Sequence, residues 1–267
     1  MKRSITIIFN TALLLSLIAG AGAAQSPYNL NFGREALVIG AGGASLVGGV
    51  LLKDQTALFT PDELARLDPS QVNSFDRGAI DNVSRHAREA SDYFLNGSHV
   101  FPLLFLANQD TRRDFGKIAF LWGETLMLNG GLTFASKYAF RRPRPFVYNR
   151  EIDVQYKMTV SAKTAFFSGH TSMTAANTFF AAKVFSDYFP ESGWKPVVWS
   201  TAVVIPAITG YLRVRAGRHY PSDVIVGYAT GALLGYFIPH LHKRPGLKDK
   251  GLELHGGLNG ALLRLTF

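Results

Sequence analysis

Long apolar stretches with few or no charges alternate with polar stretches along the chain. The apolar stretches are longer than typical strands, and their apolar residues do not alternate with polar ones, so each predicts a helix. We expect such helices over residues 93–109, 117–136, 171–189, 197–212 and 224–242. The polar stretches between them carry the prolines, glycines and charges of loops. The pattern therefore predicts an all-α fold, a bundle of about five to six helices that is embedded in a membrane.

The first residues have the parts of a secretory signal. Lys2 and Arg3 precede an apolar stretch, which ends in small residues. This order predicts a signal peptide over residues 1–24, with cleavage near Ala23 or Ala24. The alternative is that the segment stays as an uncleaved membrane anchor. Because no sorting motif indicates a eukaryotic compartment, we expect a bacterial protein that reaches the periplasm.

The rest of the chain divides into three regions. Residues 25–90 form an N-terminal extension with one apolar, glycine-rich segment at 36–52, and residues 91–244 form the core domain. Residues 245–267 form a basic tail that is weakly strand-like at its end. Glycines in an apolar helix permit close packing against a neighbouring helix. We therefore expect the segment 36–52 to pack on the bundle without crossing the membrane. The alternative is that it crosses and the signal stays as an anchor, because a cleaved signal followed by a span at 36–52 would give the wrong number of crossings.

Two readings of the apolar helices remain open. Their uncharged runs are at the lower edge of what a bilayer with a core of about 30 Å requires, and an integral membrane protein is the favoured reading. The buried helices of a soluble all-α domain give a similar pattern, and Glu124 and Lys183 lie inside two of the helices.

Basic residues indicate an orientation for the membrane reading. Arg112 and Arg113 lie between two apolar segments, and His242-Lys243-Arg244 follows the last one. If these basic residues are cytoplasmic, the segments 137–170 and 213–223 lie together on the outer side. The loops that carry the motifs below would then face the periplasm.

Composition narrows the chemistry. Of the 267 residues, 47% are hydrophobic and 18% are charged, which argues against a disordered chain. The chain has no cysteine, so disulfides, thiolate nucleophiles and cysteine-ligated metals are excluded. The formal net charge of +9 suits an anionic partner: nucleic acid, an anionic membrane surface or a phosphorylated substrate.

The first of three clusters with chemical potential is KYAFRRPRP, residues 137–145. Lys137 ends an apolar helix, and the two prolines prevent the helix from continuing. Arg144 offers a planar fork that matches phosphate oxygens, and Lys137 offers a point charge. The alternative is a basic surface that is merely solvated or lies at a membrane face.

The second cluster is Phe167-Ser168-Gly169-His170-Thr171, at the start of a helix. Ser168 can cap that helix, and the free amides of its first turn favour a bound anion. Gly169 lets the anion approach the backbone, and His170 would stand beside it as a proton donor. A capped helix with an incidental histidine is the alternative.

The third cluster, residues 213–223, lies between two apolar helices. Arg213 would add a second phosphate fork, and His219 and Asp223 are four positions apart. A carboxylate on one ring nitrogen fixes the tautomer and leaves the other nitrogen free to attack. A structural, pH-sensitive pair is the alternative.

Taken in order, the three clusters read Lys-x6-Arg-Pro, Ser-Gly-His and Arg-x5-His-x3-Asp. This arrangement resembles the type 2 phosphatidic acid phosphatase superfamily, which includes membrane lipid phosphatases, soluble class A acid phosphatases and vanadium haloperoxidases. Two positions depart from the family pattern: Phe167 stands where a proline is usual, and Leu212 where a serine is usual. Neither would take part in the chemistry.

The resemblance implies a role for each motif residue. Lys137, Arg144 and Arg213 would bind the phosphoryl oxygens, and Ser168 with the Gly169 amide would stabilise the transition state. The remaining three would form the catalytic set: His219 as nucleophile through a phosphohistidine, Asp223 as its orienting group, and His170 as general acid and then base. No metal or other cofactor is expected, because the cations neutralise the developing charge.

The sequence thus predicts a phosphatase that acts on a lipid phosphate or diphosphate. Candidate substrates are lipid A phosphate, undecaprenyl diphosphate, phosphatidylglycerol phosphate and phosphatidate. The expected partners are this lipid and the inner membrane, with the active site on the periplasmic face and no nucleic acid. The alternatives are a soluble periplasmic acid phosphatase, a vanadate-dependent haloperoxidase and a non-catalytic lipid-phosphate binder. Four further arginines could recruit a diphosphate or simply be solvated: Arg141, Arg142, Arg215 and Arg218.

Overall fold

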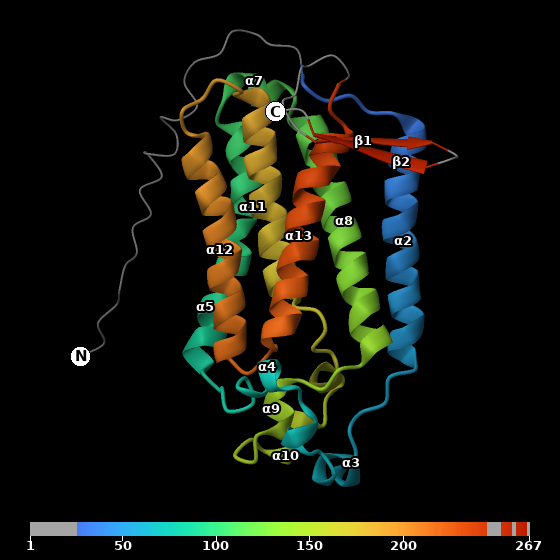
Figure 1. Cartoon of the computed structure of the whole chain (residues 1–267), viewed down its shortest axis with the longest axis vertical. Coiled ribbons are helices and arrows are strands. Elements are labelled where there is room, and N and C mark those ends of the chain that lie inside the picture. Colours follow the sequence, from blue (N-terminus) through green and yellow to red (C-terminus); the bar gives the residue numbers. More distant parts are fainter. Residues whose placement is uncertain (1–25, 245–251, 258–259, 266–267) are drawn as a thin grey trace, which may run out of the picture.

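The computed structural model describes residues 26–244, 252–257 and 260–265, and the predicted signal peptide lies outside these residues. Long helices run side by side and form a bundle (Figure 1). They are α2 (Phe32–Asp54), α5 (Arg85–Ser98), α8 (Phe115–Phe140), α11 (Gly169–Tyr188), α12 (Lys195–Arg215) and α13 (Pro221–Leu241). The predicted all-α bundle is confirmed.

Short elements connect and close the bundle. Near its two ends lie α3 (Pro61–Ala65), η2 (Pro69–Gln71), α4 (Ser74–Arg77), α6 (Val100–Leu103), η3 (Leu104–Leu106), α7 (Gln109–Arg113), α9 (Pro145–Tyr148), α10 (Val154–Lys157) and η4 (Val160–Lys163). In the tail, β1 (Leu252–Gly257) pairs antiparallel with β2 (Gly260–Leu265), so the strand-like end of the sequence is a hairpin.

The helix expected over residues 93–109 is wrong. The chain instead forms α5, which starts earlier, at Arg85, and ends at Ser98, followed by the short α6 and η3. Ser84 caps the start of α5 by accepting from the amide of Ala87, which the apolar pattern alone did not reveal. Pro102 has no amide hydrogen to donate and its ring obstructs the preceding turn, so a single helix through this region is unfavourable.

Helix α11 lies at the centre of the bundle, and α13 packs closely on it. Gly227, Gly231 and Gly235 form one stripe of α13, at four-residue spacing. A Cβ atom at Gly227 would lie 2.6 Å from the carbonyl oxygen of Ser168, so only glycine permits this approach. The stripe thereby fixes the start of α13 against the start of α11.

Helix α2 packs along α8 in the same way. A Cβ atom at Gly131 of α8 would lie 2.7 Å from the carbonyl oxygen of Gly42, and one at Gly42 would lie 3.0 Å from the Met127 side chain. The expectation that the glycines of 36–52 serve close helix packing is confirmed for Gly42 and Gly49, whereas a Cβ atom at the other three glycines would meet nothing within 4 Å. However, α2 is also long and apolar enough to cross a membrane, so the expectation that this segment does not cross lacks support.

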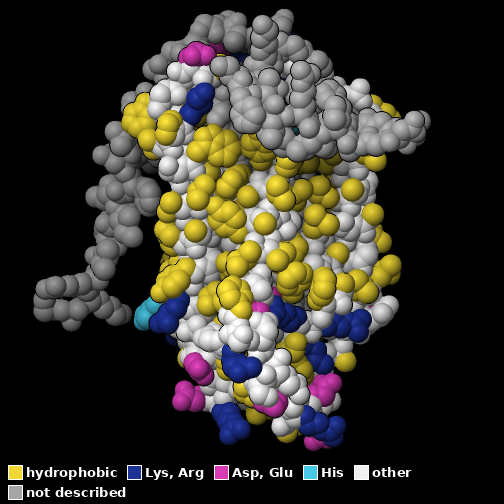
Figure 2. Space-filling view, in the orientation of Figure 1, with side chains coloured by type: hydrophobic (Ala, Val, Ile, Leu, Met, Phe, Trp, Pro, Cys, Tyr) yellow, Lys and Arg dark blue, Asp and Glu magenta, His cyan; other side chains and the backbone are white. Residues whose placement is uncertain are grey.

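Among the described residues, three helices are long and apolar enough to span a bilayer: α2, α12 and α13. Hydrophobic side chains cover the middle of the bundle, and charged side chains gather at the end that carries α3, α9 and α10 (Figure 2). Only 17 to 28% of the apolar window of each of these helices is buried within the protein. An apolar belt of this kind is typical of a membrane protein.

The motif segments lie together at one end of the bundle. The end of α8, the start of α11 and the turn from α12 to α13 meet near α4 and α9, while α7 and the end of α13 lie at the opposite end (Figure 1). The N-terminal extension packs against this motif end, where Phe59 joins Phe146 and Val147 in a small apolar cluster.

Candidate active site

The loop between α9 and α11 positions two of the cations through its backbone carbonyls. Lys137, in the last turn of α8, donates from Nζ to the carbonyl oxygens of Thr164 (3.0 Å) and Phe167 (3.1 Å). Arg144 donates from Nε to the carbonyl oxygen of Ser161 at 2.7 Å. Both side chains are therefore held toward residues 161–168, whose last member caps α11.

His219 is tied to the same loop. It lies in the turn between α12 and α13, is 1% exposed, and its Nδ1 atom is 2.7 Å from the carbonyl oxygen of Ala165. A carbonyl can only accept, so Nδ1 carries the proton and Nε2 keeps a free lone pair. Burial, with the charges of Arg144 and Lys137, holds the pKa of His219 well below its usual value. The ring is consequently neutral and able to act as a nucleophile at neutral pH.

Asp223 lies next to His219 but does not hydrogen-bond to it. Its Oδ2 atom is 3.7 Å from Nδ1 of His219 and accepts the backbone amide of Tyr220 at 2.9 Å. The sequence suggested a direct carboxylate–imidazole bond, whereas the structure gives the imidazole to Ala165. Asp223 instead caps the first turn of α13, the turn that follows His219.

Arg142 occupies the other side of that carboxylate. Its guanidinium donates to both Asp223 and Asp76, and the Cζ atom of Arg142 lies 4.1 Å from the centre of the Tyr220 ring. Asp76 also accepts from the hydroxyl of Ser222 at 2.6 Å. Arg142 is therefore a half-buried structural group whose guanidinium is engaged by two carboxylates, and not a spare cation for a second phosphate as the sequence had allowed.

The start of α11 has the geometry expected for an anion site. Ser168 is the N-cap, is fully buried, and its hydroxyl lies 2.9 Å from that of Thr171. A Cβ atom at Gly169 would meet the Thr133 side chain at 3.1 Å and would lie 3.8 Å from Lys137. Glycine thus keeps the first amides of α11 accessible beside the ammonium of Lys137.

His170 has a partner that lies outside the three clusters. Its Nε2 atom is 2.7 Å from Oδ1 of Asp92, a residue of α5. The same carboxylate oxygen lies 3.7 Å from Arg213, and Arg213 also donates to the hydroxyl of Ser91 at 3.2 Å. Asp92 therefore links His170 to Arg213. Sequence reasoning missed it, because a single acidic residue on an amphipathic helix carries no distinctive signal.

The other arginines of the clusters differ in position. Arg141 is the left-handed C-cap residue of α8 and bonds to the carbonyl of Tyr138, and Arg215 donates to Asn82 at 3.2 Å. Arg218 lies over the Phe146 ring and is close enough to act on the charges of the site. Burial, together with the charges of Arg213 and Arg218, lowers the pKa of Arg144. An anion bound here would relieve this repulsion.

All eight residues singled out from the sequence lie at this end of the bundle. Within the described part of the chain, no three His, Asp or Glu side chains are grouped so as to hold a metal ion. What the arrangement offers is a neutral imidazole, a second histidine paired with a carboxylate, and a set of cations around them. Such a set can bind and attack a phosphoryl group.

Comparison with known proteins gives concordant results. Residues 117–246 match the family model of the PAP2 superfamily. The chain is 32% identical over 178 residues to the lipid A 1-phosphatase of Porphyromonas gingivalis, an alignment that covers 60% of this chain and 36% of that protein. It is 32% identical over 103 residues to the lipid A 4'-phosphatase of the same organism, covering 37% and 39% respectively.

These alignments span little more than a third of each relative's length. No solved structure matches the chain. The matched region contains every motif residue discussed above, from Lys137 to Asp223. Residues 117–246, just under half of the chain, therefore match the PAP2 superfamily over all the motif residues.

Proposed function

We propose that this protein is a metal-independent phosphatase that hydrolyses a lipid phosphate or diphosphate through a phosphohistidine on His219. The observation that carries the proposal is the state of His219. Its Nδ1 donates to Ala165, so the lone pair of Nε2 is free, and the buried cations Arg144 and Arg213 stand around it.

In the first step, Nε2 of His219 attacks phosphorus and the bond from phosphorus to the leaving oxygen breaks. The phosphoryl oxygens are held by Lys137, Arg144 and Arg213, while Ser168 and the amide of Gly169 stabilise the charge of the five-coordinate transition state. His170 donates a proton to the leaving oxygen. Burial and the charge of Arg213 lower the pKa of His170 to about 4, and the carboxylate of Asp92, 2.7 Å away, opposes this lowering. The negative charge of a bound phosphate would raise the pKa further, toward the protonated form that this step requires.

In the second step, a water molecule attacks the phosphohistidine. His170, now neutral, accepts a proton from that water, the P–N bond breaks, and the electron pair returns to Nε2 of His219. Phosphate leaves, and the enzyme regains its starting state. Asp223 contributes by fixing the first turn of α13 and, with Arg142, the position of the loop that carries His219.

The membrane character of the bundle supports a lipid as substrate. Three of the helices that the structure describes are long and apolar enough to span a bilayer, and the site lies at the end of this apolar belt. The similar proteins are named as lipid A phosphatases, which act on a phosphorylated lipid. We infer the same class of substrate for this chain, without choosing among lipid A phosphate, undecaprenyl diphosphate, phosphatidylglycerol phosphate and phosphatidate.

We also propose that the site faces the periplasm from the inner membrane. The end opposite the site carries Arg112 and Arg113, with Lys243 and Arg244 after α13. Basic residues next to membrane helices tend to stay on the cytoplasmic side, and on this ground we place Arg112 and Arg113 in the cytoplasm. The site end also carries basic residues, among them exposed Arg85 and Arg150, so a labelling experiment has to decide the orientation. Reaction of a cysteine placed at Gly193 or at exposed Arg150 with an impermeant maleimide tests this orientation: labelling of intact cells is expected at position 150 only.

A direct test is phosphate release by the purified protein in detergent from a panel of lipid monoesters and diphosphates. We expect turnover of at least one lipid, unchanged by millimolar EDTA and inhibited by vanadate, which mimics the five-coordinate phosphoryl group. Activity on soluble phosphomonoesters alone, with recovery in the osmotic-shock fraction, would instead favour the soluble acid phosphatase. Vanadate-dependent bromination faster than phosphate release would favour the haloperoxidase.

A further inference from the structure

An apolar groove lies beside the loop of residues 161–168, on the membrane-facing side of the bundle. It is an open groove of about 690 Å³ between α2 and α13, with α8 as its floor. Figure 1 shows α8 between these two helices, and hydrophobic side chains cover this part of the surface in Figure 2. The lining contains no charged residue: Ala44, Ser45, Gly48, Leu52, Leu132, Ala135, Ser136, Ala139, Phe140, Phe166, Phe167, Val226 and Thr230.

The groove and the catalytic site share one wall. Phe166 and Phe167 line the groove, and the next residue, Ser168, is the N-cap of α11 in the site. The carbonyl of Phe167 accepts from Lys137, a proposed phosphate ligand, and the neighbouring Ser136 lines the groove. A molecule whose phosphate lies at Lys137 can therefore place an attached chain in the groove by passing a single loop.

Small residues of α2 keep the groove open. A Cβ atom at Gly48 would meet nothing within 4 Å, whereas one at the adjacent Gly49 would collide with Phe134 and approach Ala135. Gly49 thus sets the close contact between α2 and α8, while Gly48 borders open space. From Ala44 to Leu52 the groove follows α2 for about 12 Å, at 1.5 Å per residue.

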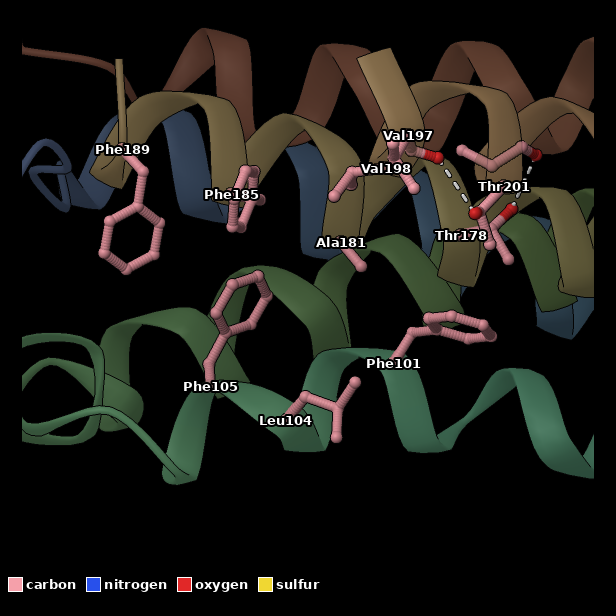
Figure 3. A pocket seen from close by; sticks show the side chains of 11 residues that line it. Phe101, Leu104, Phe105, Thr178, Ala181, Phe185, Phe189, Val197, Val198 and Thr201 are labelled. Atoms are coloured by element: carbon pink, nitrogen blue, oxygen red, sulfur yellow. Dashed lines mark hydrogen bonds between the residues drawn. The ribbon is translucent and has the colours of Figure 1, made fainter. Parts of the chain in front are cut away.

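The apolar cavity in Figure 3 differs in each of these respects. It lies between α6, η3, α11 and α12, and its volume is about 100 Å³. Its lining on α11 begins at Thr178, nine residues after Gly169 and thus about 14 Å along the helix from the site. Aromatic side chains such as Phe101, Phe105 and Phe185 surround it. The cavity is therefore smaller than the groove, and it does not adjoin the active site.

We propose that the groove binds an acyl chain of the lipid whose phosphate occupies the active site. This inference rests on the proposed function, because it requires a phosphorylated lipid in the site. An acyl chain fits the groove's chemistry, since the lining is uncharged and faces the apolar belt where α2 and α13 would lie in the bilayer. Gly48 and Ala44, whose small side chains leave room for the acyl chain, would then determine which lipids the enzyme accepts.

The test uses two variants of the same helix. Gly48→Leu places a side chain in the groove, and Gly43→Leu is the matched control, because a Cβ atom at Gly43 also meets nothing within 4 Å and Gly43 does not line the groove. Each protein is assayed with dipalmitoyl phosphatidate in mixed micelles and with para-nitrophenyl phosphate.

For Gly48→Leu we expect kcat/KM for phosphatidate to fall at least about tenfold, since each methylene displaced from an apolar site is worth roughly fourfold in binding. Its rate with para-nitrophenyl phosphate should stay at the wild-type value, and Gly43→Leu should match wild type with both substrates. Equal loss in the two variants, or no selective loss with the lipid, would overturn the acyl-chain site. If the wild-type protein hydrolyses another lipid of the panel and not phosphatidate, that lipid takes its place in the assay. A wild-type protein that hydrolyses no lipid of the panel would count against the proposed function.

A binding measurement separates the two proposals. In a His219→Ala background, which keeps the phosphate on the lipid, phosphatidate with a diazirine in its acyl chain is photolysed beside the matching diacylglycerol probe. We expect labelling within residues 44–52 or 132–140 by the phosphatidate probe, at least severalfold above the diacylglycerol probe, and its loss on adding Gly48→Leu. Equal labelling by both probes would overturn a groove that is occupied through the phosphate.

Discussion

The Nδ1 atom of His219 lies 2.7 Å from the carbonyl oxygen of Ala165, and 3.7 Å from the carboxylate of Asp223. The backbone, and not the acidic residue four positions later, therefore fixes the tautomer of the proposed nucleophile. This relationship changes what the removal of Asp223 should do. It also explains why the loop 161–168 is central to the site, since it holds Lys137 and Arg144 as well.

Asp223→Asn should slow turnover without abolishing it. Asparagine can still accept the Tyr220 amide, and the proton of Nδ1 stays on the side of Ala165. We expect kcat to fall about 10- to 100-fold, the range for groups that support a reacting residue, rather than the ~10⁴-fold loss seen when a carboxylate alone fixes a catalytic histidine. Steady-state kinetics with one lipid substrate measures this. A loss equal to that of His219→Ala would show that Asp223 has the direct role.

Asp92→Asn should impair the proton transfers of His170. The carboxylate lies 2.7 Å from His170 and stabilises its protonated form, so its loss lowers the pKa of His170 and moves the alkaline limb of the rate profile to lower pH. We expect kcat to fall by about 10²-fold, the lower part of the range for general acid–base catalysis.

The matched control is Glu89→Gln, on the same helix. Glu89 pairs with Arg85 at the surface and contacts no residue of the site. Its rate and pH profile should equal those of wild type. If Asp92→Asn gave the same unshifted profile, His170 would not depend on this carboxylate.

Asp76→Ala should destabilise the protein more than it affects the chemistry. Burial by itself raises the pKa of Asp76, but hydrogen bonds from Ser222 and Arg142 lower it below the usual value, so the carboxylate is charged and paired. Removing one partner of a fully buried pair costs about 3–5 kcal/mol of folding free energy. Because the remaining Arg142 side chain is 25% exposed and water can reach it, we expect the loss to fall below that range. Denaturant unfolding in detergent measures the loss, with the exposed Asp81→Asn as control. A variant as stable as wild type would contradict the structural role assigned to Arg142.

The pH dependence of kcat/KM reports the pKa values of the catalytic groups in the free enzyme. Burial and the charges of Arg144 and Lys137 lower the pKa of His219, so the neutral nucleophile persists as the pH falls. We expect the acid limb assigned to His219 to lie below pH 6.5, the ordinary value for histidine. Two phosphomonoesters with different phosphate pKa values separate the enzyme's limb from the substrate's. An acid limb at or above pH 6.5 with both phosphomonoesters would show that the cations do not lower the pKa of His219.

Local sequence signals predicted much of the fold and of the site. Apolar runs located α8, α11, α12 and α13, because each is long and free of strand-like alternation. Proline at positions 143 and 145 and the Ser168 cap marked the ends of helices, and these ends meet at one end of the bundle.

The remaining features depend on contacts between distant residues. Asp92 meets His170 only because α5 packs beside α11 and α12, and no local pattern encodes that packing. The Ala165 carbonyl has no residue signature at all, since every residue carries such an acceptor. Arg142 looked like a spare cation because its partners Asp76 and Asp223 lie 66 and 81 positions away.

The central claim is that His219 carries the phosphoryl group during turnover. The most direct measurement is rapid quenching of the wild-type protein with a ³²P-labelled lipid phosphate, followed by mass spectrometry of the labelled peptide. The account predicts an acid-labile, base-stable phosphate on His219, its absence in His219→Ala, and loss of turnover in that variant to the background rate. Turnover by His219→Ala at the wild-type rate, or label on a residue other than His219, would contradict it.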